Sequence, residues 1–188
     1  MRELFIDIET FSPVNLAKSG VYPYAEHPDF DILLFGYSID GGPVEVVDHD
    51  NGHQFPETVL AALVDPHVGK WAFERICLSS WLARHHPKLM AGRRYLDPDQ
   101  WHCTMVWSAY LGLPMSLDQV ATVLDLPVRK DSAGKKLIRQ FCTPATPSVF
   151  NQGGMRNPAC IRPGRVGAAH LPQPPRRRGG ACDPRPAG

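Results

Sequence analysis

Runs of apolar residues predict three β-strands in the first fifty residues. Residues 3–8 (ELFIDI) predict a first strand, 31–40 (DILLFGYSID) a second and 43–49 (PVEVVDH) a third. Asp40-Gly41-Gly42, between the second and third runs, is typical of a hairpin turn. The stretch GVYPYAEHPDFD contains two prolines and is expected to form a loop over one face. The first three strands are therefore expected to be consecutive and antiparallel.

The later residues alternate between short strands and helices. Helical spacing predicts helices over 56–64 (with Pro56 in the first turn), 72–86 and 101–111, and HVGKW at 67–71 predicts a short strand. Ser116-Leu117-Asp118-Gln119 matches a capping box that begins another helix. A final helix follows an Asp131-Ser132 cap and runs toward Phe141. The pattern predicts an α/β fold, a mixed sheet with helices packed on it.

Two acids end the first predicted strand. Asp7 and Glu9 are two residues apart, so their side chains are expected on the same face. Like charges repel, and a divalent cation between them would offset the repulsion. A third acid, Glu74, opens the helix after the short strand. The simpler interpretations are a surface pair of acids and an acid favoured by the positive end of a helix.

The chain resembles a known family over roughly residues 1–157. FIDIET is similar to the first motif of DEDD-type 3′–5′ exonucleases, and AFERICLSSWL to the second. LAKSGVYPYAEHPDFDILLFGYSID, HCTMVWSAYLGLPMSLDQVATVLDL and KDSAGKKLIRQFCTP resemble the N-terminal proofreading domain of phage-type family-A DNA polymerases. The resemblance implies an RNase H-like fold that removes nucleotides from single-stranded DNA 3′ ends with two Mg²⁺ or Mn²⁺ ions. It implies metal ligands and catalytic residues at Asp7, Glu9 and Glu74, with substrate contacts at Thr10, Phe73 and Lys70.

The second motif departs from the family pattern. The family has His-Asn ahead of the small residue and the phenylalanine, whereas Gly69 and Lys70 stand here, followed by Trp71. Lys70 is expected either to contact a phosphate or to be solvated. Three aromatic residues of the expected loop are predicted to stack on unpaired bases or, as the favoured alternative, to pack over the sheet: Tyr22, Tyr24 and Phe30.

Composition limits the class of protein. A chain of 188 residues with 43% hydrophobic content suits one domain with a real core. No run reaches the roughly 18 apolar residues of a membrane helix, and the acidic N-terminus is unlike a signal peptide. Five scattered cysteines without a CxxC pair favour a reduced, cytoplasmic setting over a disulfide framework.

The composition changes near Asn157. Residues 158–188 contain six Arg, one Asp, seven Pro and five Gly, and are expected to be a disordered tail behind a partial exonuclease domain at 1–157. The fourth acid of the family, in a late Tyr-x-x-x-Asp-Val-Glu helix, has no counterpart. Neither Asp131 nor Asp183 is expected in a helix that returns across the sheet. Reading RVGAAHLPQPPRRRGG one nucleotide later permits GWERLIFRNRRDVEA, which favours a frameshift; a functional basic tail that binds nucleic acid is the alternative.

The sequence therefore predicts a fragment of a proofreading exonuclease domain, incomplete at its C-terminus and without a polymerase domain. Loss of the fourth acid predicts weak or absent cleavage. Two alternatives stay open. The chain could be a stand-alone RNA or oligonucleotide exonuclease, or a catalytically inactive remnant that binds nucleic acid.

Overall fold

The structure is a computed structural model that describes residues 1–73, 75–126, 132–151 and 153–157. The strands are β1 (Glu3–Phe11), β2 (Asp31–Ile39), β3 (Glu45–Asp48), β4 (Gly69–Trp71) and β5 (Trp101–His102). The helices are α1 (Leu16–Ser19), α2 (Val21–Glu26), α3 (Glu57–Val64), α4 (Arg75–His85), α5 (Pro87–Met90), α6 (Thr104–Tyr110), α7 (Leu117–Val123) and α8 (Ser132–Phe141). Short 3-10 turns cover His49–Asn51, Pro98–Gln100 and Val149–Asn151. Among the described helices, none is long and apolar enough to cross a membrane.

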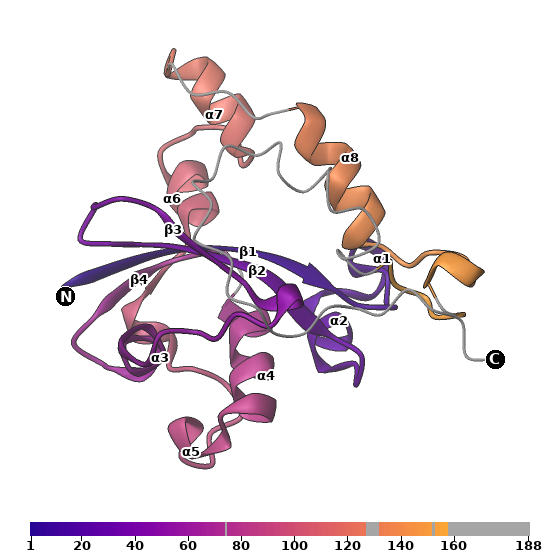
Figure 1. Ribbon diagram of the computed structural model, residues 1–188. Coiled ribbons are helices and arrows are strands. Elements are labelled where there is room, and N and C mark those ends of the chain that lie inside the picture. Colours follow the sequence, from indigo (N-terminus) through magenta and orange to yellow (C-terminus); the bar gives the residue numbers. More distant parts are fainter. Residues whose placement is uncertain (74, 127–131, 152, 158–188) are drawn as a thin grey trace.

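The five strands form one mixed sheet in the order β3-β2-β1-β4-β5. β1 pairs antiparallel with β2 and β2 antiparallel with β3, whereas β1 with β4 and β4 with β5 are parallel. Helices α3, α4 and α5 lie on one side of the sheet, and α6, α7 and α8 on the other (Figure 1). We refer to these sides as the α4 face and the α8 face. The predicted α/β class, a mixed sheet flanked by helices, is confirmed, and the first three strands are antiparallel as expected.

The predicted hairpin turn is confirmed at residues 39–42. Asp40 and Gly41 both have positive φ, 50° and 72°, as a type I′ turn requires, and the Gly42 N–H donates to the Ile39 carbonyl at 2.8 Å. The Asp40 carboxylate also accepts hydrogen bonds from the backbone N–H groups of Arg2 (2.7 Å) and Glu3 (2.8 Å). These hydrogen bonds hold the pKa of the Asp40 carboxyl below its ordinary value. The turn thereby fixes the start of β1.

The main core lies on the α4 face. Leu4, Ile6 and Ile8 of β1 are buried there, since alternate residues of a strand point to one side. Trp81 of α4 packs on Phe55 with ring centroids 4.4 Å apart, and its indole N–H donates to the Asp31 carboxylate at 3.0 Å. This face therefore holds the sheet against α3 and α4.

A smaller core lies on the α8 face. It contains Phe11, Leu33 and Phe141, with the partly buried Leu137 and Cys142 packed against it. A β-bulge makes it possible, because Glu9 pairs with Leu34 while Thr10 pairs with Ile32, leaving Leu33 as the extra residue. The bulge lets Leu33 reach the α8 face although Ile32 and Phe35 serve the main core.

Three predictions of local structure need correction. The expected loop after residue 19 contains α2, in which Pro23 lies in the first turn, where its missing N–H breaks no helical hydrogen bond. The helix expected over 101–111 begins only at Thr104, because Trp101 and His102 pair with β4 as β5. Ser116 is the N-cap of α7 but makes no side-chain capping hydrogen bond. Asp131 and the predicted tail at 158–188 lie outside the described residues.

Leu78→Ala tests the main core. Leu78 of α4 is fully buried, so we expect the free energy of unfolding to fall by about 2–5 kcal/mol in urea titrations. Leu16→Ala, at a side chain that is half exposed, is the matched control and should change it by less than about 0.5 kcal/mol. Equal effects of the two substitutions would contradict the assignment of α4 to the core.

Candidate functional site

Asp7 and Glu9 lie on the α8 face of the central strand. They alternate with Ile6 and Ile8, which are buried on the opposite face. Asp7 is exposed and Glu9 is half-buried. Two carboxylates from one strand thus project to the side of the sheet that carries α6–α8, as their spacing predicts.

Gly36 leaves space beside Asp7. It is the β2 residue directly paired with Asp7, and cross-strand partners project to the same face. A glycine inside a strand lowers its stability and often marks a close approach by a ligand or backbone. A Cβ at this position would lie 3.5 Å from the Asp7 carbonyl oxygen, an ordinary contact, so backbone crowding does not demand glycine. Our sequence interpretation missed Gly36, although a lone glycine within LLFGYS was a usable signal.

Cys142 lies beside Glu9. Its thiol donates a hydrogen bond to Glu9 Oε2 at 3.7 Å, from the residue that follows the end of α8. Burial, with the neighbouring Glu9 carboxylate adding to it, raises the pKa of the Cys142 thiol to about 12, so the thiol stays protonated. The C-terminal end of α8 therefore returns across the sheet to the carboxylates. Phe141 and the partly buried Leu137 anchor α8 on Phe11 and Leu33. Asp131 and Asp183, which we did not expect in a helix that returns across the sheet, lie outside the described residues.

Aromatic rings extend from the carboxylates toward β4. Phe5 stacks on Trp71 with ring centroids 6.0 Å apart, and Trp71 also contacts His102 at 4.6 Å and Trp107 of α6 at 5.3 Å. Phe5 and Trp71 are paired residues of parallel strands, so Trp71 shares the face of Asp7. Phe73, two residues further, is 48% exposed. Flat, partly exposed rings of this kind can stack on nucleic-acid bases.

The third predicted ligand, Glu74, lies outside the described residues. Its neighbour Phe73 follows β4, the strand beside β1, and its other neighbour Arg75 begins α4. Among the described residues, no group of three or more His, Cys, Asp or Glu side chains is arranged to hold a metal ion. The described part of the site therefore contributes two carboxylates, Asp7 and Glu9.

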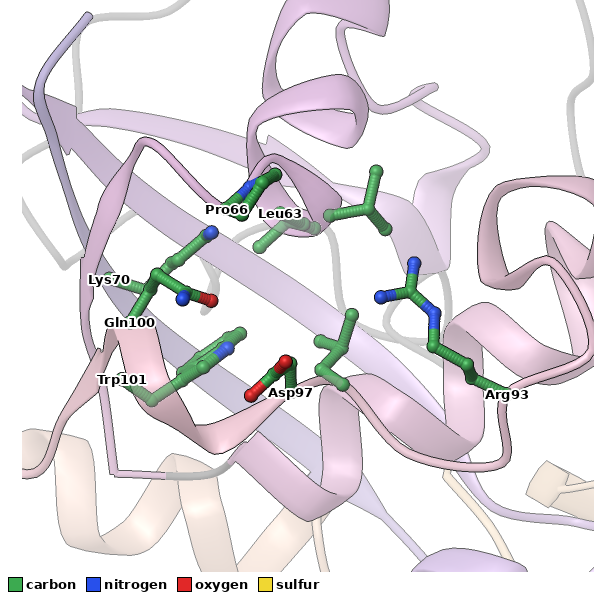
Figure 2. A pocket seen from close by; sticks show the side chains of 9 residues that line it. Leu63, Pro66, Lys70, Arg93, Asp97, Gln100 and Trp101 are labelled. Atoms are coloured by element: carbon green, nitrogen blue, oxygen red, sulfur yellow. The ribbon is translucent and has the colours of Figure 1, made fainter.

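Lys70 is turned away from these carboxylates. It pairs with the buried Leu4 on the α4 face, and its side chain is 1% exposed. Figure 2 shows it at a cavity of about 60 Å³, whose lining residues include Arg93, Asp97 and Gln100. Its ammonium donates to the Asp65 carbonyl, and burial lowers its pKa although the carboxylates of Asp65 and Asp97 act in the opposite direction.

The expectations for Lys70 therefore need correction. A solvated lysine is wrong, since the side chain is enclosed by the end of α3 and by residues 93–101. The structure also does not bring Lys70 together with Asp7 and Glu9, where a phosphate contact was expected, because the two lie on opposite faces of the sheet. A cavity of this size, lined by charged and amide groups, suits a few water molecules that satisfy the remaining ammonium protons.

Thr10 and two of the three aromatic residues of the expected loop lie on the α4 side of the sheet, away from the carboxylates. The Thr10 hydroxyl hydrogen-bonds to the Tyr24 hydroxyl at 2.9 Å, so its side chain is engaged on the α4 side. Tyr24 and Phe30 are buried in edge-on contact, 5.7 Å between centroids, which confirms packing over the sheet for these two. Tyr22 is half exposed and contacts the Tyr95 ring edge-on.

The geometry defines a class: an α/β domain whose mixed sheet carries two carboxylates on its central strand. Comparison with known proteins then gives a relative. The chain is 47% identical over 161 residues to a DNA polymerase of Bacillus phage SP02. That match covers 84% of this chain and 23% of the polymerase, so the chain spans about a quarter of its relative's length. The chain is therefore a homologue of part of a phage DNA polymerase, and the predicted resemblance is confirmed.

The chain was also compared with models of known protein families and with solved structures. No model of a known protein family matches the chain. Among solved structures, the chain is similar to Brucella melitensis NrnC with bound Mg²⁺, with a TM-score of 0.46 and 17% identity over 70% of this chain and 57% of that chain. A likeness at this level supports no conclusion about the site.

Gly36→Val tests whether the space beside Asp7 serves a ligand. We expect the free energy of unfolding to change by no more than about 1 kcal/mol, because a side chain suits a strand better than glycine does. Mn²⁺ binding, followed by electron paramagnetic resonance, should weaken by about tenfold or more, an effect of the size seen for residues around metal ligands. Gly36→Ala, which adds only a Cβ, should weaken it less. Unchanged Mn²⁺ binding in the valine variant would remove Gly36 from the site.

Alkylation of Cys142 tests the position of α8. At pH 8.5, iodoacetamide should modify Cys142 in the folded chain at least about 100-fold more slowly than in urea, because the raised pKa leaves little thiolate. Peptide mass spectrometry would separate Cys142 from the other cysteines. Similar rates in the folded and unfolded chain would contradict the contact between α8 and Glu9.

Proposed function

We propose that residues 1–157 are part of a 3′–5′ exonuclease domain that acts on single-stranded DNA ends. Asp7, Glu9 and Glu74 are the proposed catalytic and metal-binding residues. One observation carries the proposal. In a homologue of a phage DNA polymerase, Asp7 and Glu9 share one face of the central strand, next to the strand whose end leads into Glu74.

The described residues fit a hard divalent cation. Carboxylate oxygens are the donors that Mg²⁺ and Mn²⁺ prefer, and Mg²⁺ commonly uses only one or two carboxylates with water in its other positions. Such ions, when bound, stabilise charge on the attacking and leaving oxygens of a phosphodiester and lower the pKa of bound water. The exposed Asp7 is open to such an ion, and the Cys142 thiol orients Glu9.

The same face supplies features suited to a DNA end. The absence of a side chain at Gly36 leaves room next to Asp7 for a sugar-phosphate group. The exposed ring of Phe73 offers a base a surface to stack on without sequence preference. Single-stranded substrate is favoured because a base must leave its own stack to use such a ring.

We further propose that the domain is incomplete. The match to the phage polymerase covers 84% of the chain, and residues 1–157 make up the same fraction of its 188 residues. This agreement supports a change of reading frame at the start of the Arg- and Pro-rich tail. The fourth carboxylate of the resembled family would then be missing. Loss of correctly placed metal charge forfeits several kcal/mol of transition-state stabilisation, and each 1.36 kcal/mol is about tenfold in rate.

A second candidate function is binding of nucleic acid without cleavage. It is favoured by the exposed side chain of Phe73, which can stack on a base whether or not a metal ion is bound. This function would be identified if the chain bound a labelled DNA oligonucleotide and did not shorten that oligonucleotide in the presence of Mg²⁺ or Mn²⁺. Parallel assays with RNA oligonucleotides distinguish a DNA exonuclease from an RNA exonuclease.

The activity of three proteins tests the proposal. With a 5′-labelled single-stranded DNA and Mg²⁺, we expect the 188-residue chain to be at least roughly a thousandfold slower than an intact polymerase relative. A chain in which residue 157 is followed by the alternative reading frame should recover the activity, and Asp7→Ala in that restored chain should abolish it.

Two results would contradict this account. Rapid Mg²⁺-dependent cleavage by the 188-residue chain, lost on Asp7→Ala, would show that the site is already complete. Activity of the restored chain that survives Asp7→Ala would show that the carboxylates of β1 are not catalytic.

A further inference from the structure

The segment 104–126, which contains α6 and α7, exposes an unusual number of large apolar side chains. We call it the apolar arm. Eight of the fifteen exposed large hydrophobic residues in the described chain belong to it: Val106, Trp107, Tyr110, Leu111, Met115, Val123, Leu124 and Leu126. None of residues 104–116 or 118–126 is buried. Figure 1 shows α6 and α7 on the α8 face, with α6 next to the sheet and α7 farther from it. Clustered exposed apolar residues mark an interaction surface.

The chemistry of the arm limits what can cover it. Within residues 104–126 the only charged side chains are Asp118 and Asp125, and there is no Lys or Arg. A matching partner has an apolar stripe flanked by basic residues, so that the partner's charges meet these acids. A second copy of the arm would instead place acids against acids.

The basic tail of the chain lacks the apolar part of this match. Residues 158–188 contain three large aliphatic residues, Ile161, Val166 and Leu171, and no Phe, Trp or Tyr. The tail therefore supplies positive charge but too few large side chains to cover eight exposed ones.

We propose that the apolar arm binds the polypeptide that continues, in phage DNA polymerases of this kind, after the region matched by this chain. The chain spans only 23% of its polymerase relative, so that protein has further sequence to place against the surface equivalent to the arm. The string that a shift of one nucleotide permits for the tail, GWERLIFRNRRDVEA, combines Trp, Leu, Ile and Phe with four Arg against two Glu and one Asp, a net positive charge. That composition meets both requirements of the arm.

The proposal implies that a separate polypeptide can complete the domain. An amphipathic helix in an apolar groove is a common mode of recognition, in which residues three and four apart fill the surface. The proposal rests on the part of the proposed function that makes this chain an incomplete domain. It does not depend on which carboxylates are catalytic, because binding can be measured without cleavage.

Titration with a defined peptide tests the proposal. The probe is a fluorescein-labelled peptide covering the residues that directly follow the matched region in the phage SP02 polymerase. It is titrated with the full 188-residue chain in EDTA, and binding is read by fluorescence anisotropy. We expect saturable binding that Tyr110→Asp and Leu111→Asp each weaken at least about tenfold, as for residues central to an interface. Val149→Asp is the matched control, since Val149 is 93% exposed but lies outside the arm, and should leave binding unchanged.

Several results would overturn the proposal. One is that the peptide does not bind the wild-type chain, whose folding is checked by circular dichroism. Another is that all three substitutions weaken peptide binding equally. A dimer of the chain in light scattering that Tyr110→Asp dissociates would assign the arm to a second copy. Binding without any nuclease activity in the restored chain would leave the proposal standing and reject the catalytic assignment instead.

Discussion

The double pairing of β1 is the constraint on which the rest of the structure depends. β1 is the only described strand flanked by one antiparallel and one parallel neighbour, β2 and β4. Because successive side chains of a strand point to opposite faces, the odd- and even-numbered residues of β1 lie on opposite faces at the centre of the sheet. Leu4, Ile6 and Ile8 are held in the main core, which forces Asp7 and Glu9 to the α8 face. A shift of one residue in this register would bury the acids and expose the core residues.

The two faces of the sheet are covered by helices to different degrees. On the α4 face, Trp81 and its neighbours form a closed core, and the indole N–H of Trp81 donates a hydrogen bond to Asp31. On the α8 face, Phe141 anchors the end of α8 and Trp107 of α6 contacts Trp71, while eight large side chains of the apolar arm are exposed. The open face is also the face of the carboxylates. The proposed incompleteness of the domain would account both for the exposed surface and for the expected weakness of the site.

Local patterns in the sequence predicted much of this arrangement. The alternation in FIDIET gave the face of Asp7 and Glu9, and Asp40-Gly41 gave the hairpin, because strand alternation and positive φ are local properties. β5 could not be predicted, since Trp101 and His102 become a strand only through pairing with β4. The burial of Lys70 was also hidden, because it depends on the parallel register that pairs Lys70 with Leu4. The contact between Cys142 and Glu9 joins residues far apart in the chain and needs the bulge at Leu33.

The central claim is that Asp7 and Glu9 of β1 hold a divalent cation, and anomalous diffraction from a crystal soaked in Mn²⁺ tests it most directly. The account predicts an anomalous peak on the α8 face within about 2.0–2.6 Å of an oxygen of Asp7 or Glu9, the range for metal–carboxylate contacts. The peak should vanish in an Asp7→Asn, Glu9→Gln crystal. A soaked crystal with Mn²⁺ only elsewhere, or a peak unchanged by the double substitution, would contradict the account.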